Sequence, residues 1–348
     1  MKNTLKENNF QIEECQSKEE WDDFITSFKQ ANFLQSWDFY EFYKNIKHQV
    51  VRRVIKSNGK IVAAYAGEVE PAKRGRHLAI AGGPILDWTN DILIGTVFKD
   101  MISVAKKMQC IFVRVRPQIE NTSESAKIFQ KYHFKRAPMY LSVEFAGVLD
   151  LTKTEDEILA GMRQRLRRAL RKAEKNQIKI ETTTDPAAIK EFYQIELQTA
   201  KRHDFYTFSE NFLTKQFEAF AKNQEAVLYI AKKDGKILAE NFMIFYGSEA
   251  SYHYGVSSEL GTKYSGAPLL HMQAMRDARQ RGITRYNFWG IVDENDTKHR
   301  FYGVSVFKRG FGVEELKYLP AHDLILNKVE YYLKTYPIET IRRKIRHV

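Results

Sequence analysis

The segment Lys233-Asp234-Gly235-Lys236-Ile237-Leu238-Ala239-Glu240-Asn241-Phe242 predicts the fold, because a tight turn leads directly into a strand. The Asp-Gly pair supplies the positive φ angles that a two-residue hairpin turn requires. The same pattern occurs earlier, at Ser57-Asn58-Gly59-Lys60, followed by the strand Ile61–Ala66. Two such hairpins, far apart in the chain, indicate that one structural plan occurs twice.

The sequence that follows each hairpin extends this repeat. A further strand, an amphipathic helix and another strand are expected each time: helix Ile92–Met108 with strand Ile111–Val115, and helix Pro268–Arg281 with strand Arg285–Trp289. Helical sequence also precedes each copy. Helix, hairpin, strand, helix, strand is typical of the GNAT acyltransferase fold. We therefore predict an α/β protein (an α+β mixed sheet) built from two tandem GNAT-like domains.

The boundary between the two copies is expected near Leu149-Asp150. Thr154 and Glu157 there form a candidate capping box at the start of a helix. That helix is predicted to run unbroken from Thr154 to Lys175 and to end at Asn176, without the sustained heptads of a coiled-coil arm. The segment from His322 to Val348 is predicted to be helical and basic. The domains are therefore 1–149 and 150–320, followed by the segment 321–348.

Composition limits the class of protein. The chain has 348 residues, 43% of them hydrophobic and 13% aromatic, which is enough for two packed cores. No run approaches the length of apolar sequence that spans a membrane, and the residues Met1–Glu7 lack the apolar stretch of a secretory signal. Cys15 and Cys110 are the two cysteines, which excludes a cysteine zinc site. We expect a cytoplasmic protein without a metal or cofactor, and a monomer by default.

The net charge of +12 favours anionic partners such as phosphates, tRNA or an acidic membrane surface. A dense basic cluster has only Glu174 to oppose it: Arg163, Arg165, Arg167, Arg168, Arg171, Lys172, Lys175 and Lys179. A solvated helix face that promotes solubility is the alternative interpretation.

A single lysine occurs in the otherwise apolar and glycine-rich segment Val306-Phe307-Lys308-Arg309-Gly310-Phe311-Gly312, about seventeen residues after the aromatic run Tyr286–Ile291. A lysine between aromatic residues can be held partly desolvated, where its charge acts more strongly than in water. The alternative is a solvated lysine on a strand. The sequence has no Gly-x-Ser-x-Gly motif and no histidines at metal-ligand spacing. His203, His253, His271, His299 and His322 are therefore expected to be ordinary surface or packing residues.

The late aromatic and lysine segments resemble the C-terminal signature of the FemABX family. The resemblance extends through most of the chain in the expected order: Phe33–Trp37, Gly83-Pro84-Ile85, Asp150-Leu151-Thr152, Met162–Lys175, Thr199–Arg202 and Tyr252–Gly255. Members of this family are non-ribosomal peptidyltransferases that move an amino acid from aminoacyl-tRNA to a peptidoglycan precursor. The resemblance implies the same activity here, on UDP-MurNAc-pentapeptide or lipid II, without a covalent nucleophile.

The resemblance also implies roles for individual residues. Lys308 would stabilise the oxyanion and the tRNA end, and Tyr254 would face the reacting centre, so these two are the predicted catalytic residues. The predicted substrate-binding residues are Arg202, Tyr206, Tyr252, Phe307, Gln35 and Trp37, with Arg202 expected at the acceptor's diphosphate. Arg165 and Arg168 are predicted to bind tRNA or phosphate.

Several of these assignments have a purely structural alternative. Tyr252 and Tyr254 share a face if their strand is regular, and both could be ordinary half-buried strand aromatics. Trp37 could be a core residue. The resemblance implies that the first domain binds the acceptor and that the second is the catalytic, aminoacyl-tRNA side. In the family such a C-terminal tail returns to the first domain, which the segment 321–348 would complete. The basic residues Arg342, Arg343, Lys344 and Arg346 would also suit peripheral contact with the inner membrane face.

Two positions depart from the family's pattern. Arg116-Pro117 stands where the family often has Asp-Pro, so a general base from that position is excluded, and Asn287 replaces a frequent Asp. Two other functions remain open. Lys263-Tyr264-Ser265-Gly266-Ala267-Pro268 is a degenerate form of the GNAT pyrophosphate loop, which would fit an acyl-CoA-dependent N-acyltransferase. The charge alone would also fit a non-catalytic RNA-binding protein.

Overall fold

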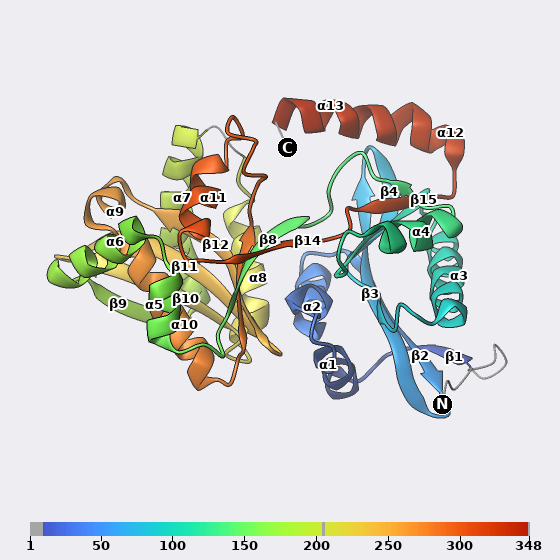
Figure 1. Cartoon of the computed structure of the whole chain (residues 1–348). Coiled ribbons are helices and arrows are strands. Elements are labelled where there is room, and N and C mark those ends of the chain that lie inside the picture. Colours follow the sequence, from blue (N-terminus) through green and yellow to red (C-terminus); the bar gives the residue numbers. More distant parts are fainter. Residues whose placement is uncertain (1–9, 204–205, 347–348) are drawn as a thin grey trace. The chain divides into compact units, whose positions relative to one another are not determined.

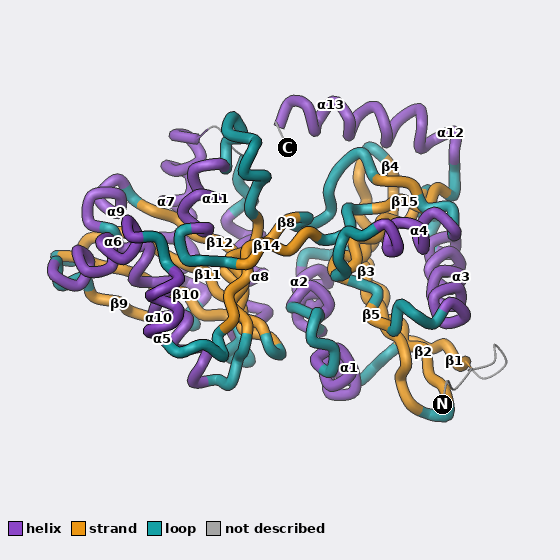
Figure 2. Tube along the Cα trace, in the orientation of Figure 1, coloured by secondary structure: helices purple, strands orange, loops and turns teal. Residues whose placement is uncertain are grey.

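The computed structural model describes residues 10–203 and 206–346 (Figures 1 and 2). The chain divides into two compact units. Unit 1 consists of Met1–Glu144 and Lys317–Val348, and unit 2 of Phe145–Leu316. The assignment of acceptor binding to the first half and catalysis to the second stays a prediction.

Unit 1 is a mixed sheet with helices. Its strands are β1 (Phe10–Glu14), β2 (Gln49–Ser57), β3 (Lys60–Ala72), β4 (Gly75–Gly82), β5 (Ile85–Leu86), β6 (Phe112–Pro117), β7 (Lys135–Arg136) and β15 (His322–Ile325). Its helices are α1 (Lys18–Thr26), α2 (Trp37–Asn45), α3 (Asp91–Lys107), α4 (Ser123–Lys131), α12 (Lys328–Glu330) and α13 (Tyr336–Arg346). The strand order is β1-β2-β3-β4-β6-β15-β7, with β5 paired to β3 and with β4 parallel to β6.

Unit 2 repeats this plan. Its strands are β8 (Phe145–Asp150), β9 (Lys179–Thr183), β10 (Ala226–Lys233), β11 (Lys236–Tyr246), β12 (Glu249–Ser257), β13 (Arg285–Gly290) and β14 (Glu314–Lys317). Its helices are α5 (Glu155–Gly161), α6 (Gln164–Lys175), α7 (Ile189–His203), α8 (Glu210–Ala221), α9 (Glu259–Tyr264), α10 (Gly266–Gln280) and α11 (Tyr302–Arg309). The strand order is β14-β8-β13-β12-β11-β10-β9, and β12 is parallel to β13.

The two predicted hairpins are confirmed. β2 pairs with β3 through Asn58 and Gly59, whose φ angles are 51° and 75°. β10 pairs with β11 through Asp234 and Gly235, with φ angles of 48° and 74°. Asparagine, aspartate and glycine are the residues that adopt such positive φ angles at least cost. The repeat that the sequence predicted therefore rests on the same turn chemistry in both units.

The prediction of a single helix over Thr154–Lys175 is wrong in one respect, because the segment forms two helices. Thr154 begins α5 with the expected capping box, in which Glu157 accepts from the Thr154 amide. The break follows at Met162, where Arg167 Nη1 donates to the carbonyls of Ala160 and Met162 at 3.0 and 2.9 Å. α5 and α6 are 7 and 12 residues long, which is far too short for a coiled-coil arm.

The C-terminal segment also differs from its prediction. His322–Ile325 is not helical but forms β15, which pairs with β6 on one side and β7 on the other. A buried ion pair fixes this strand, because Asp323 accepts from the Arg114 guanidinium through two hydrogen bonds of 2.7 Å. The helical part begins only at Lys328. Nowhere in residues 10–203 and 206–346 is there a helix that is long and apolar enough to cross a membrane.

Candidate active site

The central parallel strand pair of unit 2 opens toward its carboxyl end. β12 and β13 pair only at Glu249–Ser251 with Arg285–Asn287. Both strands then become irregular, with a register shift of β12 against β11 around residue 253 and of β13 against β8 between Asn287 and Gly290. The later residues of the two strands are therefore not joined in a ladder, and side chains from several elements gather there.

Asn287 stabilises the irregular end of β13. Its Oδ1 accepts from the amide of Trp289 at 2.8 Å, and its Nδ2 donates to Glu249 Oε1 at 3.1 Å. Trp289 has a φ of 62°, which a bulky residue adopts only under such constraint. This departure from the family's frequent Asp thus has a structural role here. The next carbonyl, that of Gly290, accepts from the side chain of Lys308.

Lys308 is a buried cation without a carboxylate. It lies in the last turn of α11 and is 7% exposed, so the alternative of a solvated strand lysine is wrong. Its Nζ donates to the Gly290 carbonyl at 2.7 Å and lies 5.3 Å from the centroid of the Tyr252 ring. Among the described residues no acidic side chain forms an ion pair with it. Burial lowers the pKa of Lys308 to about 7.

A buried histidine lies close enough to Lys308 to feel its charge. His271 of α10 lies 4.5 Å from Tyr252 and 5.6 Å from Phe307, measured between ring centroids. Its Nδ1 bonds Tyr286 at 2.8 Å, whereas its Nε2 is buried without a hydrogen-bond partner in the described part of the chain. Burial, aided by the charge of Lys308, lowers the pKa of His271 to about 3, so the ring is neutral at pH 7.

The Tyr252 hydroxyl lies over Gly255, where a Cβ would overlap it. Asn241 stands opposite Gly255 in the ladder, so its side chain belongs to the same face of the sheet. Asn241 Nδ2 is buried, and within the described residues it has no hydrogen-bond partner. Buried polar atoms are seldom left unpaired in native proteins, and ligand sites are a common reason. This face of β11 and β12 therefore carries a buried polar atom that has no partner within the described residues, which makes it a candidate ligand-binding face.

Tyr254 lies on the opposite face, so the expectation that it shares a face with Tyr252 is wrong. The bulge at His253 reverses the alternation. The Tyr254 ring lies 5.8 Å from Phe242 and 6.3 Å from Phe208, while the ring of Phe242 lies 4.9 Å from that of Phe217 in α8. Burial, and then the nearby charge of Glu196, raises the pKa of Tyr254, which keeps its hydroxyl protonated.

Glu196 of α7 is a candidate site residue that sequence reasoning missed. It is 8% exposed, and its Oε2 is buried without a hydrogen-bond partner among the residues that the structure describes. Burial raises its pKa to about 7. The sequence carried one signal, because Glu196 follows the buried Phe192 by four residues and therefore lies on the same, inward face of the helix.

The other predicted residues of unit 2 are more exposed. Phe307 is half-buried against His271, and Tyr206 is 78% exposed after α7. Arg202 belongs to α7, but its side chain lies outside the described residues. Arg165 and Arg168 are exposed on α6.

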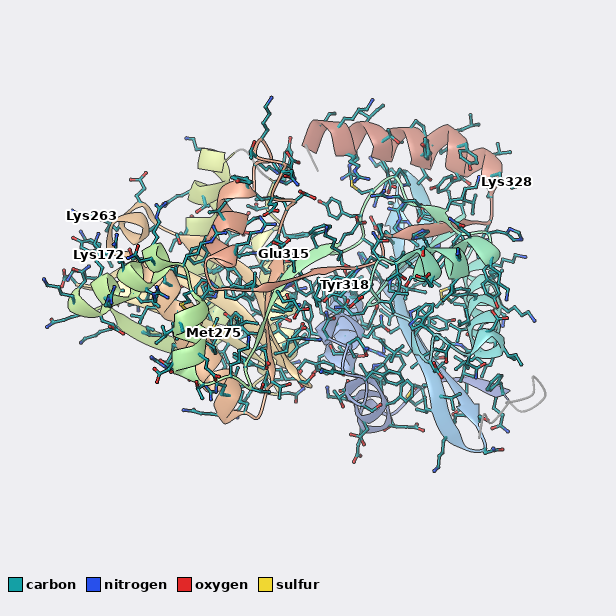
Figure 3. All side chains as sticks on the ribbon, in the orientation of Figure 1. Lys172, Lys263, Met275, Glu315, Tyr318 and Lys328 are labelled. Atoms are coloured by element: carbon teal, nitrogen blue, oxygen red, sulfur yellow. The ribbon has the colours of Figure 1, made fainter. Side chains whose placement is uncertain are left out.

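The basic helix α6 is joined to its neighbours at both ends. It starts beside the end of α11, because the Arg163 amide donates to the Gly310 carbonyl at 2.8 Å. Further along, Lys172 Nζ donates to the carbonyl of Lys263 at 2.9 Å, so the basic face continues to α9 (Figure 3).

The two predicted residues of unit 1 are held by internal contacts. Gln35 is buried, its Oε1 accepts from the Ala66 amide at 2.9 Å, and its Nε2 donates to the Ala81 carbonyl at 2.7 Å. The ring of Trp37 packs under the Arg52 guanidinium at 3.9 Å. The Gln35 amide thus links its turn to β3 and β4. Acceptor binding by either side chain stays a prediction.

Arg116, the other departure from the family's pattern, is buried in unit 1. Its guanidinium donates to Gln118 Oε1 at 2.7 Å and to Ser142, and it lies 5.1 Å from the Tyr318 ring centroid. These contacts stabilise the segment that follows β6.

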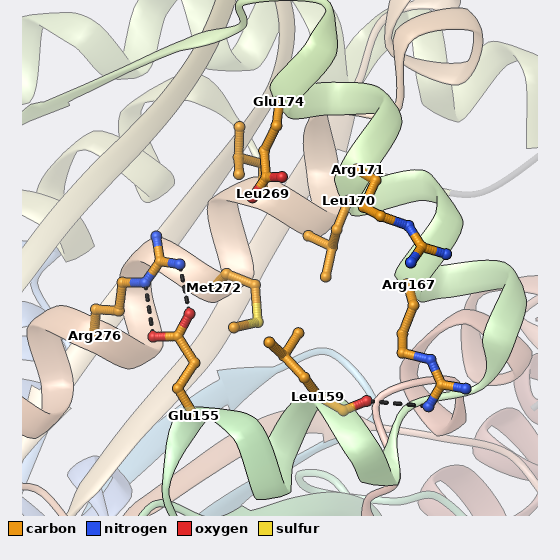
Figure 4. Close-up of a pocket in the computed structure, with 9 residues that line it drawn as sticks. All are labelled: Glu155, Leu159, Arg167, Leu170, Arg171, Glu174, Leu269, Met272 and Arg276. Carbon is orange, nitrogen blue, oxygen red and sulfur yellow. Dashed lines mark hydrogen bonds and ion pairs between the residues drawn. The ribbon is translucent and has the colours of Figure 1, made fainter.

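A pocket of about 190 Å³ lies between α5, α6 and α10 (Figure 4). Leu159, Leu170, Leu269 and Met272 form its apolar part, and Arg276 pairs with Glu155 at its edge. Lys308, Arg165 and Arg168 are not among its lining residues. It is therefore a feature distinct from the opening between β12 and β13.

The loop before α10 has a packing explanation. A Cβ at Gly266 would lie 3.0 Å from Leu238 Cβ and 3.2 Å from Ala231 Cβ, so glycine allows α10 to approach the sheet. Packing thus explains Gly266, the one glycine of the degenerate pyrophosphate loop, and no bound nucleotide is needed to explain it. In the described parts of the chain, histidine, cysteine and acidic side chains do not form a group of three or more that could hold a metal ion.

The fold and the site together define the class of protein. The sheet is mixed and GNAT-like, and its parallel strand pair opens beside a buried lysine. The chain is therefore an acyltransferase built from two tandem GNAT-like units. The FemAB family model matches residues 16–236 and 213–337. The chain therefore belongs to the FemAB family.

Named relatives agree with this family. The chain is 20% identical over 396 residues to a lipid II:glycine glycyltransferase of Staphylococcus aureus, covering 91% of this chain and 93% of the relative. The crystal structure of FemX superposes with a TM-score of 0.83 at 19% identity, covering 93% and 99% of the two chains. A tandem GNAT protein from the clavulanic acid biosynthesis pathway gives 0.59 at 11% identity, covering 91% and 98%. The predicted FemABX membership, fold class and transferase class are confirmed.

Proposed function

We propose that this protein transfers an amino acid from aminoacyl-tRNA to the stem-peptide amine of a peptidoglycan precursor, lipid II or UDP-MurNAc-pentapeptide. The named relatives that act on lipid II support the precursor. The net charge of +12 and the exposed Arg165 and Arg168 support an anionic donor such as tRNA. The reaction takes place in the cytoplasm, and the enzyme works as a monomer with peripheral contact to the inner membrane face.

The observation that carries this proposal is the environment of Lys308. A buried ammonium held by one carbonyl, with no carboxylate paired to it in the described chain, is not explained by structure alone. In an ester aminolysis, negative charge develops on the carbonyl oxygen, and a preorganised cation in a dry site stabilises that charge strongly. Lys308 therefore supplies the oxyanion stabilisation.

The step is a direct displacement. The acceptor nitrogen attacks the ester carbonyl carbon, a new C–N bond forms and the C–O bond to the tRNA ribose breaks. The acceptor amine loses one proton, and the departing ribose oxygen gains one. Because the ester is already activated, positioning and charge stabilisation are sufficient, and a covalent enzyme intermediate is not needed.

We assign proton transfer to Tyr254 and Glu196, which lie on the sheet face opposite Tyr252, so this assignment requires the substrate to extend around the irregular end of β12. With a pKa of about 7, the Glu196 carboxyl is partly ionised at neutral pH and accepts the proton that the attacking amine releases. The Tyr254 hydroxyl, kept protonated by burial and by Glu196, donates to a substrate oxygen. Arg202, Tyr206, Tyr252 and Phe307 bind the substrates, with Arg202 at the acceptor's diphosphate and Gln35 and Trp37 on the acceptor side.

Mass spectrometry tests this function directly. The chain is incubated with a pool of charged tRNAs and either UDP-MurNAc-pentapeptide or lipid II in micelles. We expect a mass gain equal to one amino-acid residue on at least one acceptor. The gain should vanish with Lys308→Ala and persist with Lys215→Ala, which removes a half-buried lysine of α8 paired with Glu218. No gain on either acceptor, together with thermal stabilisation by CoA, would contradict the proposal and favour an acyl-CoA substrate.

A further inference from the structure

The helical segment Lys328–Arg346 of unit 1 carries a concentration of exposed apolar side chains. Seven of the fifteen exposed large hydrophobic residues in the described chain fall between positions 329 and 345: Val329, Tyr332, Leu333, Tyr336, Ile338, Ile341 and Ile345. Leu333 and Val329 are 73% and 70% exposed. Single exposed apolar residues are ordinary, but a contiguous set indicates an interaction surface.

These residues form one stripe because of an irregular turn. Val329, Leu333, Ile338, Ile341 and Ile345 follow one another at intervals of 4, 5, 3 and 4 residues. The interval of five, from Leu333 to Ile338, begins inside Tyr331–Thr335, which is a π-helical turn and so contains one extra residue. The extra residue keeps Ile338 in line with Leu333, so the stripe continues from α12 through to α13 along the red helical segment in Figure 1.

The opposite side of this segment is fixed to the sheet of unit 1. Tyr331 donates its hydroxyl to Asp323 at 2.7 Å, and Thr335 donates to the Arg74 carbonyl at 2.6 Å. Glu339 accepts from Arg114 at 2.6 Å and from Arg74 at 2.7 Å. All three of these segment residues are buried. The segment cannot roll to bury its stripe without breaking this network, so the apolar face is held outward.

Basic residues accompany the stripe. The segment contains Lys328, Lys334, Arg342, Arg343, Lys344 and Arg346 against only Glu330 and Glu339. Glu339 is neutralised by the buried arginines, and Glu330 pairs with Lys334 at 3.2 Å. Lys328, labelled in Figure 3, and Lys344 are exposed. An apolar stripe with a basic excess is the composition of helices that lie in the headgroup region of anionic bilayers.

We propose that the outward face of Lys328–Arg346 binds the surface of an anionic lipid bilayer, with its apolar stripe in the headgroup–acyl boundary. This segment is thus the surface through which the chain makes its peripheral contact with the membrane. The inference rests on the proposed function only in that a lipid-linked acceptor would bring the enzyme to a bilayer.

Vesicle co-sedimentation of the full chain tests the proposal without any turnover. We expect wild-type protein to sediment with vesicles containing anionic phosphatidylglycerol, and to bind vesicles of phosphatidylcholine alone much more weakly. The double variant Leu333→Asp/Ile341→Asp should lose at least about tenfold in partitioning, because two apolar side chains of the stripe are replaced by anions. The control is Ile12→Asp, which puts one such charge at an exposed apolar residue of β1 and should bind like wild type.

Several outcomes would overturn the proposal. One is equal binding of wild type and the double variant, and another is equal binding to neutral and anionic vesicles. A third is a wild-type dimer that the double variant dissociates, without vesicle binding by either, since a second copy would then cover the stripe. Transfer to soluble UDP-MurNAc-pentapeptide should be unchanged in the double variant. If wild type shows no transfer but still binds vesicles, the proposed function fails while the membrane surface stands.

Discussion

The parallel strand pairs of the two units differ in how far they stay together. In unit 1, β4 and β6 pair over six residues, from His77–Gly82 to Phe112–Pro117. In unit 2, β12 and β13 pair over only three. Both units bury a cation close to this pair, but Arg114 of unit 1 contacts two carboxylates, whereas Lys308 of unit 2 contacts one carbonyl. In our proposal, the closed pair with its neutralised cation is structural, whereas the open pair, whose lysine has no carboxylate partner in the described chain, takes part in the chemistry.

The largest expected effect on stability comes from breaking the closed arrangement. Arg114→Met leaves Asp323 buried without a guanidinium and Glu339 with that of Arg74 alone, which should cost about 3–5 kcal/mol of unfolding free energy. Urea unfolding measures this loss. The control Arg276→Met removes a largely exposed pair with Glu155 and should cost at most about 1 kcal/mol. Equal costs for the two variants would show that the buried network does not stabilise unit 1.

Glu196→Gln tests the buried carboxyl beside Tyr254, on the other face of β12 from Tyr252. If the carboxylate accepts the proton, the transfer rate should fall by about 10²-fold, while the fold is retained. Single-turnover transfer to either acceptor measures the rate. Glu218→Gln, at a half-buried position of α8 whose side chain pairs with Lys215, should leave the rate unchanged. A fully active Glu196→Gln variant would remove Glu196 from the mechanism.

Lys308→Met should stabilise the fold, in contrast to Arg114→Met. The folded pKa of Lys308, about 7, lies below its ordinary value, so burial of the charged form opposes folding. This cost is fully present below pH 7 and disappears as the pH rises toward the ordinary lysine pKa. We expect a gain of about 0.5–2 kcal/mol at pH 6 that shrinks at pH 9. Thermal unfolding at both pH values checks it, and a loss of stability would indicate a structural lysine.

The smallest effects should come from the basic face of α6. Arg165→Ala and Arg168→Ala should each weaken tRNA binding a few-fold, because each removes one exposed cation. The slope of log K against log salt concentration should fall by about 0.7–0.9 for each phosphate that the variant no longer neutralises. Filter binding at several salt concentrations measures the slope. Arg276→Ala is the control, and an equal change in that variant would mean that the face has no special part in binding.

Local chemistry explains what the sequence could predict. The Asn-Gly and Asp-Gly hairpins and the Thr154–Glu157 capping box depend on neighbouring residues only, and all are present. The break after Gly161 depends instead on Arg167 reaching back to carbonyls of α5, and β15 depends on Arg114 pairing with Asp323. Such interactions join residues that the local pattern does not connect.

The candidate site shows the same difference between features that depend on neighbouring residues and features that depend on distant ones. The sequence singles out Lys308 because its motif is short and local, whereas its position at the end of α11 and its single carbonyl partner were not predictable from that motif. The bulge at His253, which places Tyr252 and Tyr254 on opposite faces, has no sequence signal that we could identify. Glu196 did have one, a carboxylate four residues after a buried phenylalanine on the same helix face.

The central claim is that protonated Lys308 stabilises the oxyanion in the open strand pair. Its most direct test is the ratio of single-turnover transfer rates of wild type and Lys308→Met between pH 6 and 9, because this ratio cancels the ionisation of the acceptor amine. We predict a ratio of about 10²–10³ below pH 7 that declines as the pH rises through about 7, where Lys308 loses its proton. A ratio that stays constant, or that rises with pH, would contradict the account.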